Sequence, residues 1–293
     1  MKIGIHFLSI LFFYSVSTFA ATPDVQVSII KTADIQVLES LVYQGGPWRK
    51  ITNNFSAFLI KHDNDYILFD TGLGTHVDEQ FKKDMTWWQR PFFKYNGPVT
   101  PASVQLKNNN INHIDKIFLS HAHWDHASGI DDFPEAPIYI NGEEKEFTKT
   151  PGHTAGSPWA SQLSLPTTIW KEYSFSQKEY EGFPLSYDLY NDGSLVLVPL
   201  FGHTPGSVGL FVTVSSGKKY FLIGDAVWSA KAVSVNAPKF CLAGSIVDSD
   251  SHATDETIKA LHELNKKKPE IILVPAHDGV TQDSLGYFPT WLK

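Results

Sequence analysis

The interpretation of this chain starts from Ser120-His121-Ala122-His123-Trp124-Asp125-His126, which follows the short apolar run Ile114–Leu119. The apolar run has the length of a buried strand. Side chains alternate along a strand, so His121 and His123 are expected on one side, and a tight turn can bring Asp125 and His126 round to face them. Imidazole and carboxylate are ligands that zinc accepts when cysteine is absent. A solvated polar loop is the alternative, but burial beside an apolar strand would demand a partner for every polar group.

The spacing of these residues resembles that of a known family. His121, His123, Asp125 and His126 match the H-x-H-x-D-H signature of the metallo-β-lactamase superfamily. Other segments extend the resemblance, in the order that the superfamily has, over about residues 25–280: Leu68-Phe69-Asp70-Thr71-Gly72, Gly202-His203-Thr204-Pro205-Gly206-Ser207, Ile223-Gly224-Asp225 and Val274-Pro275-Ala276-His277-Asp278. The resemblance implies one α/β domain, an αββα sandwich, with metals at the edge where strand ends and loops meet.

The resemblance also implies a full ligand set for two divalent ions. In the order of the chain, these ligands are His121, His123, Asp125, His126, His203, Asp225 and His277. The first two histidines and His203 would hold one ion, Asp125, His126 and His277 the other, and Asp225 would bridge both, while Asp70 would be structural. We expect zinc, although iron, manganese or cobalt fit the same ligands. A hydroxide bridging the ions would attack a carbonyl, because bound zinc lowers the pKa of water to about 7. Asp125 and Asp225 are the expected catalytic proton carriers, with water as the alternative.

Two Gly-His-Thr segments compete for the third histidine motif. His153, in Thr150-Pro151-Gly152-His153-Thr154-Ala155-Gly156-Ser157, is the better match as an isolated string. However, an expected strand leads into His203 and another follows Ser207, whereas no strand flanks His153. We therefore expect His203 to be the ligand and His153 to lie in a turn or a pocket wall. Other histidines are expected to be surface or partly packed residues: His62, His76, His113, His252 and His262.

Several details bear on the substrate. The Asp225 position argues against the typical metallo-β-lactamases, which lack that aspartate, while the long excursion over residues 80–110 and Asp278 resemble N-acyl-homoserine lactonases. Trp228 departs from that group, many members of which have a tyrosine there, and an indole cannot deliver a proton. We expect hydrolysis of a lactone or related ester, with acyl-homoserine lactone first and quorum quenching as the role. The alternatives are a β-lactam, thioester or phosphoester hydrolase and a non-catalytic metal-binding module.

Clustered aromatic residues are the candidate substrate pocket. Its members are Trp87, Trp88, Phe92, Phe93 and Trp228. An apolar wall of this kind would suit an acyl chain, but aromatic clusters equally serve a core or a homodimer contact. The expected partner is therefore a small molecule, with a homodimer as the further candidate.

Short apolar runs predict a sheet-rich domain with one long late helix. Strands are expected at 25–30, 35–42, 55–60, 66–69, 114–119, 138–140, 194–200, 208–214, 220–223 and 271–274. Asn64-Asp65 suggests a hairpin turn, and residues 254–267 have helical periodicity with lysines at the C-terminal end. The stretch 141–190 is expected to be irregular.

Composition and the N-terminus predict an exported protein. Residues 1–20 have a signal-peptide pattern, with Lys2 followed by an apolar run and small residues up to Ala20. This leaves a domain at 21–293, located in the periplasm or secreted, with no stable membrane span after cleavage. Cys241 is the only cysteine, so neither an internal disulfide nor a thiolate zinc site is available. The formal net charge of −7 disfavours nucleic acid as a partner.

Overall fold

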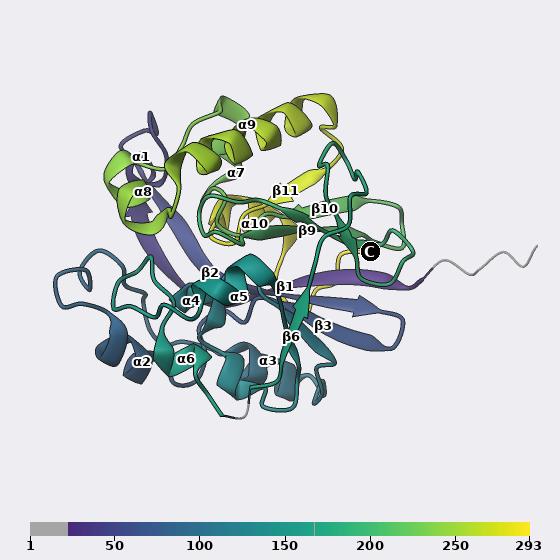
Figure 1. Cartoon of the computed structure of the whole chain (residues 1–293), viewed down its shortest axis with the longest axis horizontal. Helices are drawn as coiled ribbons and strands as arrows, with labels where there is room; N and C mark the ends of the chain where they lie inside the picture. Colours follow the sequence, from purple (N-terminus) through teal and green to yellow (C-terminus); the bar gives the residue numbers. More distant parts are fainter. Residues whose placement is uncertain (1–22, 167) are drawn as a thin grey trace, which may run out of the picture.

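Two β-sheets pack face to face between layers of helices in the computed structural model, which describes residues 23–166 and 168–293 (Figure 1). The first sheet has the order β1-β2-β3-β4-β5-β6, and the second has the order β11-β10-β9-β8-β7. The strands of the first sheet are β1 (Val25–Leu38), β2 (Lys50–His62), β3 (Asp65–Phe69), β4 (Lys116–Phe118), β5 (Ile138–Asn141) and β6 (Trp170–Tyr173). Those of the second are β7 (Tyr187–Asp188), β8 (Leu195–Pro199), β9 (Val208–Thr213), β10 (Lys219–Leu222) and β11 (Ile272–Val274).

The alternation of apolar side chains explains why two sheets stack. In β8, Leu195 and Leu197 face the first sheet, whereas Val196 and Val198 face the helices outside. The same alternation repeats along β9 and β10. Because both faces of each central strand are apolar, each sheet needs a cover on both sides. The sheets cover one another, and helices cover the outer faces.

The outer helices divide between the two sheets. Residues of α3 (Ala102–Asn108), α4 (Trp124–Ala127) and α6 (Ala160–Leu163) pack in the cluster outside the first sheet. Residues of α7 (Ala230–Val235) and α9 (Ser251–Lys267) pack outside the second. The other helices are α1 (Glu39–Val42), α2 (Val77–Asp84), α5 (Gly142–Phe147), α8 (Cys241–Val247), α10 (Gly279–Leu285) and a 3-10 turn at Ile130–Asp132. This arrangement confirms the expected αββα sandwich and single domain.

Several sequence expectations need correction. The two strands expected at 25–30 and 35–42 are one strand, β1, with an irregularity between Lys31 and Ala33, and its expected end is the helix α1. The hairpin turn lies at residues 63–64, one position earlier than expected, with Asp63 at φ 53°. The stretch 141–190 contains α5, α6, β6 and β7. No helix of the described residues is long and apolar enough to cross a membrane, and the expected signal peptide lies outside them.

Candidate metal centre

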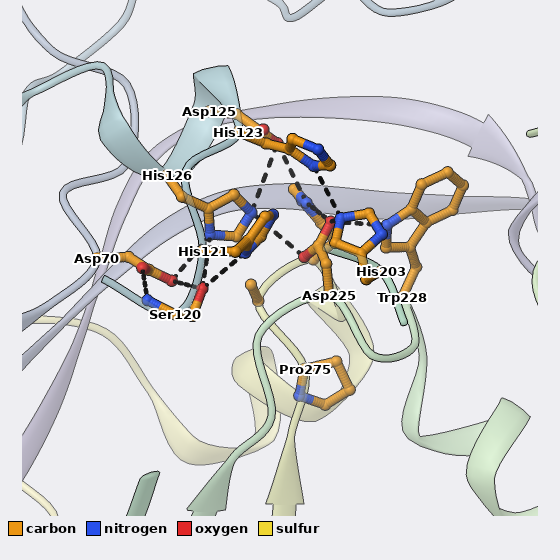
Figure 2. Close-up of polar contacts among 12 residues, drawn as sticks. Asp70, Ser120, His121, His123, Asp125, His126, His203, Asp225, Trp228 and Pro275 are labelled. Carbon is orange, nitrogen blue, oxygen red and sulfur yellow. Dashed lines mark hydrogen bonds and ion pairs between the residues drawn. The ribbon is translucent and has the colours of Figure 1, made fainter. Parts of the chain in front are cut away.

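Five histidines and two aspartates converge at one edge of the sandwich, where strands end (Figure 2). The segment after β4 supplies four of these side chains, the β8–β9 loop supplies His203, and Asp225 and His277 follow β10 and β11. Three overlapping groups have donor atoms within 4.8 Å of one another: His121-His123-His203, His121-His126-Asp225 and Asp125-His126-His277. The structure therefore brings together every side chain in the expected ligand set.

Asp225 lies between the two halves of this cluster. Its Oδ2 atom is 3.1 Å from His277 Nε2 and 3.6 Å from His203 Nε2. Its Oδ1 atom is 3.3 Å from His126 Nε2. The carboxylate of Asp125 is 3.2 Å from His277 Nε2 on the other side. This placement is what a carboxylate shared between two ions requires.

Four of the five imidazoles are oriented by oxygen atoms that contact their Nδ1 atoms, whereas His123 Nδ1 lies 2.9 Å from His203 Nε2. The distances are 2.9 Å from His121 to Ser120 Oγ, 2.8 Å from His126 to Asp70 Oδ2, 2.7 Å from His203 to Asp248 Oδ1 and 2.6 Å from His277 to Asn54 O. An imidazole that donates its Nδ1 proton to an oxygen keeps its Nε2 lone pair free. These contacts therefore favour the tautomer that presents Nε2 to a metal.

Asp70 has the structural position that the resemblance implied. It follows β3 with φ 60°, and its buried carboxylate accepts hydrogen bonds from the Ser120 backbone and hydroxyl, both at 2.7 Å. It also contacts His126 Nδ1 (Figure 2). Asp70 thus ties the end of β3 to both ends of the histidine segment without itself belonging to a ligand group.

Glu144, in α5, joins the two histidine loops, and sequence reasoning missed it. Its fully buried carboxylate accepts hydrogen bonds from Ala122 N at 2.6 Å, Thr204 Oγ1 at 2.6 Å and Gly206 N at 3.0 Å. Burial raises the pKa of Glu144 to about 7, although these donors oppose the rise. The sequence signal that could have identified Glu144 was its position shortly after the apolar strand Ile138–Asn141.

Lys239 and Asp248 form a second support that the sequence did not reveal. Lys239 is 2% exposed, and its Nζ atom lies 2.8 Å from Asp248 Oδ1, the atom that contacts His203 Nδ1. Burial raises the pKa of Asp248, but Lys239 and His203 outweigh it and hold that pKa at about 2. Asp248 lies two residues before Asp250, the N-cap residue of α9, and no motif in the sequence marks it.

Only a glycine fits before His203. Gly202 has φ +125°, and a Cβ atom there would lie 2.2 Å from the backbone nitrogen of Thr254 in α9. The close approach lets Asp250 N donate to Gly202 O and Ser249 N to His203 O. The loop that carries His203 is therefore fixed against the start of α9.

His153 lies outside the cluster. Its side chain is 68% exposed, and its Nδ1 atom is 3.4 Å from Asp84 Oδ1. His62, in contrast to the other spare histidines, is buried, contacts Asp192 at 2.8 Å and stacks on Tyr190. The geometry thus supports His203 as the third histidine.

The electrostatics of the cluster suit cation binding. Burial lowers the pKa of His121 and His123 well below the usual value, and neighbouring imidazoles add to the effect. Burial also opposes protonation of His277, but the Asp225 and Asp125 carboxylates outweigh it and raise the pKa of His277 to about 10. Two buried carboxylates thus need positive charge nearby, while the first histidines stay neutral, as metal ligands must.

Unpartnered polar atoms also indicate that the cluster is suited to bind cations. Within the described residues, the buried Nε2 atoms of His121, His123 and His126 and the Oδ1 atom of Asp225 have no hydrogen-bond partner, although His126 Nε2 and Asp225 Oδ1 lie 3.3 Å apart. Buried polar atoms without partners are costly and rare. Nitrogen and carboxylate donors gathered in this way fit divalent zinc and its borderline neighbours in chemistry.

A cavity of about 390 Å³ opens from the cluster. Its base includes Asp125, Asp225 and His277, and its walls come largely from β1, α8 and the segment after α2. Of the expected pocket aromatics, Trp88, Phe92, Phe93 and Trp228 line it. Trp87 does not line this cavity and is 80% exposed, so the prediction that it belongs to the pocket is wrong.

An αββα sandwich with histidines and aspartates gathered at one edge defines the metallo-β-lactamase fold class. A model of the metallo-beta-lactamase superfamily matches residues 55–277. The chain belongs to this superfamily.

Relatives and solved structures extend the comparison. N-acyl homoserine lactonase AttM of Rhizobium radiobacter is 27% identical over 165 residues, which are 55% of this chain and 57% of that protein. AttM of Azorhizobium caulinodans is 30% identical over 175 residues, or 59% and 64% of the two proteins. The chain thus spans less than two thirds of the length of these curated relatives.

Two structures show the shared fold at low sequence identity. An N-acyl homoserine lactone hydrolase with N-hexanoyl-L-homoserine bound at its catalytic metal center has a TM-score of 0.69 and 20% identity, covering 92% of this chain and 100% of that one. AidC, a dizinc quorum-quenching lactonase, has a TM-score of 0.58 and 17% identity, covering 87% and 88%.

Proposed function

We propose that this protein is a hydrolase that uses two divalent metal ions, zinc foremost, to open lactones, with N-acyl-homoserine lactones as the leading substrates. The observation that carries the proposal is the cavity that joins the ligand cluster to an apolar wall. An acyl-homoserine lactone combines a polar ring with an apolar chain. The ring would lie at the cluster and the chain along the wall. The names of the AttM relatives and of the two structures agree with this substrate class.

The residues that would hold the ions are those of the three ligand groups. Ions bound there would supply a nucleophilic water of lowered pKa and polarise the substrate carbonyl. The chain itself orients four of the five imidazoles through the oxygen atoms at their Nδ1 positions. It also excludes water from the wall of the cavity through apolar side chains such as Phe55, Trp124 and Ile246.

Ring opening needs a proton for the leaving oxygen. Asp125 and Asp225 are the acidic side chains that line the cavity, and as carboxylates they would accept the proton that the attacking water loses and pass it to the leaving oxygen. Trp228 Nε1 donates a hydrogen bond to Asp225 Oδ2 at 2.8 Å, so it orients that carboxylate (Figure 2). An indole nitrogen donates without giving up its proton. We therefore assign proton transfer to the aspartates and carboxylate orientation to Trp228.

A substrate panel tests this proposal. The metal-loaded protein is mixed with short-chain and long-chain acyl-homoserine lactones, a β-lactam, a thioester and a phosphotriester, and proton release or product is followed. We expect opening of the lactones, with a lower KM for the longer chain because it covers more apolar wall. Turnover of another class without lactone opening would refute the lactone assignment and keep a metallohydrolase. Absence of turnover on all of them would favour a non-catalytic module.

We also propose that the protein is exported after removal of residues 1–20. The apolar run behind Lys2 and the small residues up to Ala20 support this proposal. Fractionation of producing cells and N-terminal sequencing of the purified protein test it. A chain that keeps its first residues and stays in the cytosol would contradict it.

A further inference from the structure

Large apolar side chains on the segments that line the cavity project into solvent. We call this set the aromatic rim; it consists of Leu41, Trp48, Trp87, Trp88, Phe92 and Leu242, with exposed fractions from 45% to 86%. Four of the six also line the cavity, whereas Trp48 and Trp87 do not. Trp48 belongs to the loop that folds back on α1 through the Ser40 N to Pro47 O hydrogen bond. Figure 1 shows α1, α8 and the chain after α2 on the same side of the molecule.

The segments that carry the rim differ in charge from the rest of the chain. Residues 40–53, 86–100 and 229–247 contain six lysines and arginines and no aspartate or glutamate, so all 31 carboxylate side chains of the protein lie elsewhere. Among these cations, Lys50, Lys94 and Lys231 are exposed. Glu39, which borders the first segment, is buried and paired with Arg49 at 2.5 Å. The rim is thus apolar and locally cationic on a protein with a net charge of −7.

We propose that the aromatic rim docks this protein on an anionic lipid bilayer, with the mouth of the cavity against the membrane. Tryptophan suits the boundary between water and lipid, because its ring is apolar and its N–H is polar. Each lysine or arginine near an anionic bilayer adds about 1 kcal/mol of attraction. At physiological ionic strength charges are screened beyond roughly 8 Å, so the exposed lysines of these segments act on the lipid headgroups that the rim would touch.

The geometry favours a bilayer over a second copy of the chain. A symmetric dimer through the rim would place its cations opposite one another, which is unfavourable. The apolar cavity also continues from the rim into the interior, so an amphiphile dissolved in the bilayer could enter without crossing water. The docking itself does not rest on the proposed lactone chemistry, because it requires no substrate.

Vesicle binding tests the proposal on the full chain. We expect sedimentation with vesicles of phosphatidylglycerol and phosphatidylcholine, at least tenfold weaker binding to phosphatidylcholine alone, and a similar loss in 0.5 M salt. Brominated acyl chains in the anionic vesicles should quench tryptophan fluorescence. Trp48→Ser/Trp87→Ser should weaken binding at least tenfold, and Lys50→Gln/Lys231→Gln about 25-fold, or roughly fivefold for each charge.

Matched controls separate docking from catalysis and from the N-terminus. Val104→Ser/Lys107→Gln changes an exposed apolar residue and a lysine on α3, outside the rim, and should bind like the wild type. None of the four substituted residues, Trp48, Lys50, Trp87 and Lys231, lines the cavity, so turnover of a soluble short-chain lactone should not change. Because residues 1–22 are common to all variants, equal vesicle binding by all of them would overturn the proposal. A dimer that Trp48→Ser/Trp87→Ser dissociates, without vesicle binding by the wild type, would also overturn it.

Discussion

At the scale of single residues, the two Gly-His-Thr segments give a sharp comparison. His203 is 1% exposed inside a ligand group, whereas His153 is a surface residue. We expect His203→Ala to lose most of one bound ion and to lower activity by orders of magnitude, because it opens the coordination sphere. His153→Ala should keep the bound ions and the activity. Metal content by elemental analysis is the measurement, and the reverse pattern would transfer the ligand role to His153.

Asp225 and Trp228 separate two roles at the cavity base. Asp225→Asn removes a charge shared between the two halves of the cluster, so kcat should fall by at least about a hundredfold. Trp228→Phe removes only one hydrogen bond to Asp225 Oδ2 and keeps an aromatic wall, so kcat should stay within about tenfold while KM rises. Steady-state kinetics on an acyl-homoserine lactone decide this. A kcat loss at Trp228 as large as that at Asp225 would mean that Trp228 has a role beyond orientation.

Lys239 is a positioning residue, since it contacts Asp248 and not the expected substrate. Lys239→Met would leave the buried Asp248 carboxylate without its strongest cation and loosen the support of His203. We expect a loss of metal affinity of about 10–100-fold, measured by competition with a chelator. The exposed Lys107→Met is the matched control. Unchanged affinity in Lys239→Met would show that Asp248 holds His203 without help.

At the scale of elements, a polar cluster joins the two sheets at the first residues of β3 and β4, the opposite strand ends from those that lead to Asp70 and the metal ligands. Tyr190, between β7 and β8, donates to Asp65 Oδ2 at 2.5 Å and accepts from Lys116 Nζ at 2.9 Å, and its ring stacks on His62. Asp65 and Lys116 belong to β3 and β4 of the first sheet. Tyr190→Phe should therefore cost about 1–3 kcal/mol of stability at pH 8.

The same cluster predicts the sign of a pH dependence. Burial, and then the hydrogen bond to Asp65, raise the pKa of Tyr190 to about 12 from 10.0. Between these values the unfolded chain has lost a proton that the native protein keeps, so the wild type loses stability as pH rises. Denaturant unfolding at pH 9 and pH 11 should show the gap between wild type and Tyr190→Phe narrowing. Tyr66→Phe is the control, and a gap of constant size would contradict the shifted pKa.

The elements that sequence predicted well are those with local periodicity. The central strands β3, β8, β9 and β10 and the helix α9 lie within a few residues of their expected ranges. Apolar alternation and helical spacing are local signals, so they can be read without knowledge of the fold. The four-residue α1 and α6 and the two-residue β7 are too short for a period and depend on tertiary packing.

The residues of the metal centre likewise divide into those that the sequence predicted and those that it did not. The spacing of the motifs predicted the seven ligand candidates, and the structure brings all seven together. Glu144 and Asp248 act through partners 60 and 45 residues away, at Thr204 and His203 respectively, and Lys239 acts on His203 through Asp248. No pattern along the chain reports such distances. Buried ionisable residues that hold ligands therefore appear only once the fold is known.

At the scale of the whole molecule, the unpartnered donors predict that metal is part of stability as well as of chemistry. An ion that binds the native state and not the unfolded chain stabilises by about 2.7 kcal/mol at a hundredfold excess over its Kd. For a chain of this size that shift corresponds to a rise in Tm of roughly 5–10 °C. We expect zinc to produce it with about two ions bound per chain. Thermal unfolding of chelator-treated and zinc-loaded protein, with elemental analysis, measures both quantities.

Magnesium provides the control, because it prefers oxygen ligands in near-octahedral geometry and this cluster offers five imidazoles. At equal concentration it should leave Tm almost unchanged. In His203→Ala the zinc-induced rise should shrink, since one group loses a ligand, while in His153→Ala it should persist. One ion or fewer per chain after full zinc loading would sink the two-metal assignment. If zinc left Tm unchanged, the buried imidazoles and carboxylates would be satisfying one another without a metal. The proposed hydrolase would then lack the metal that supplies its nucleophile.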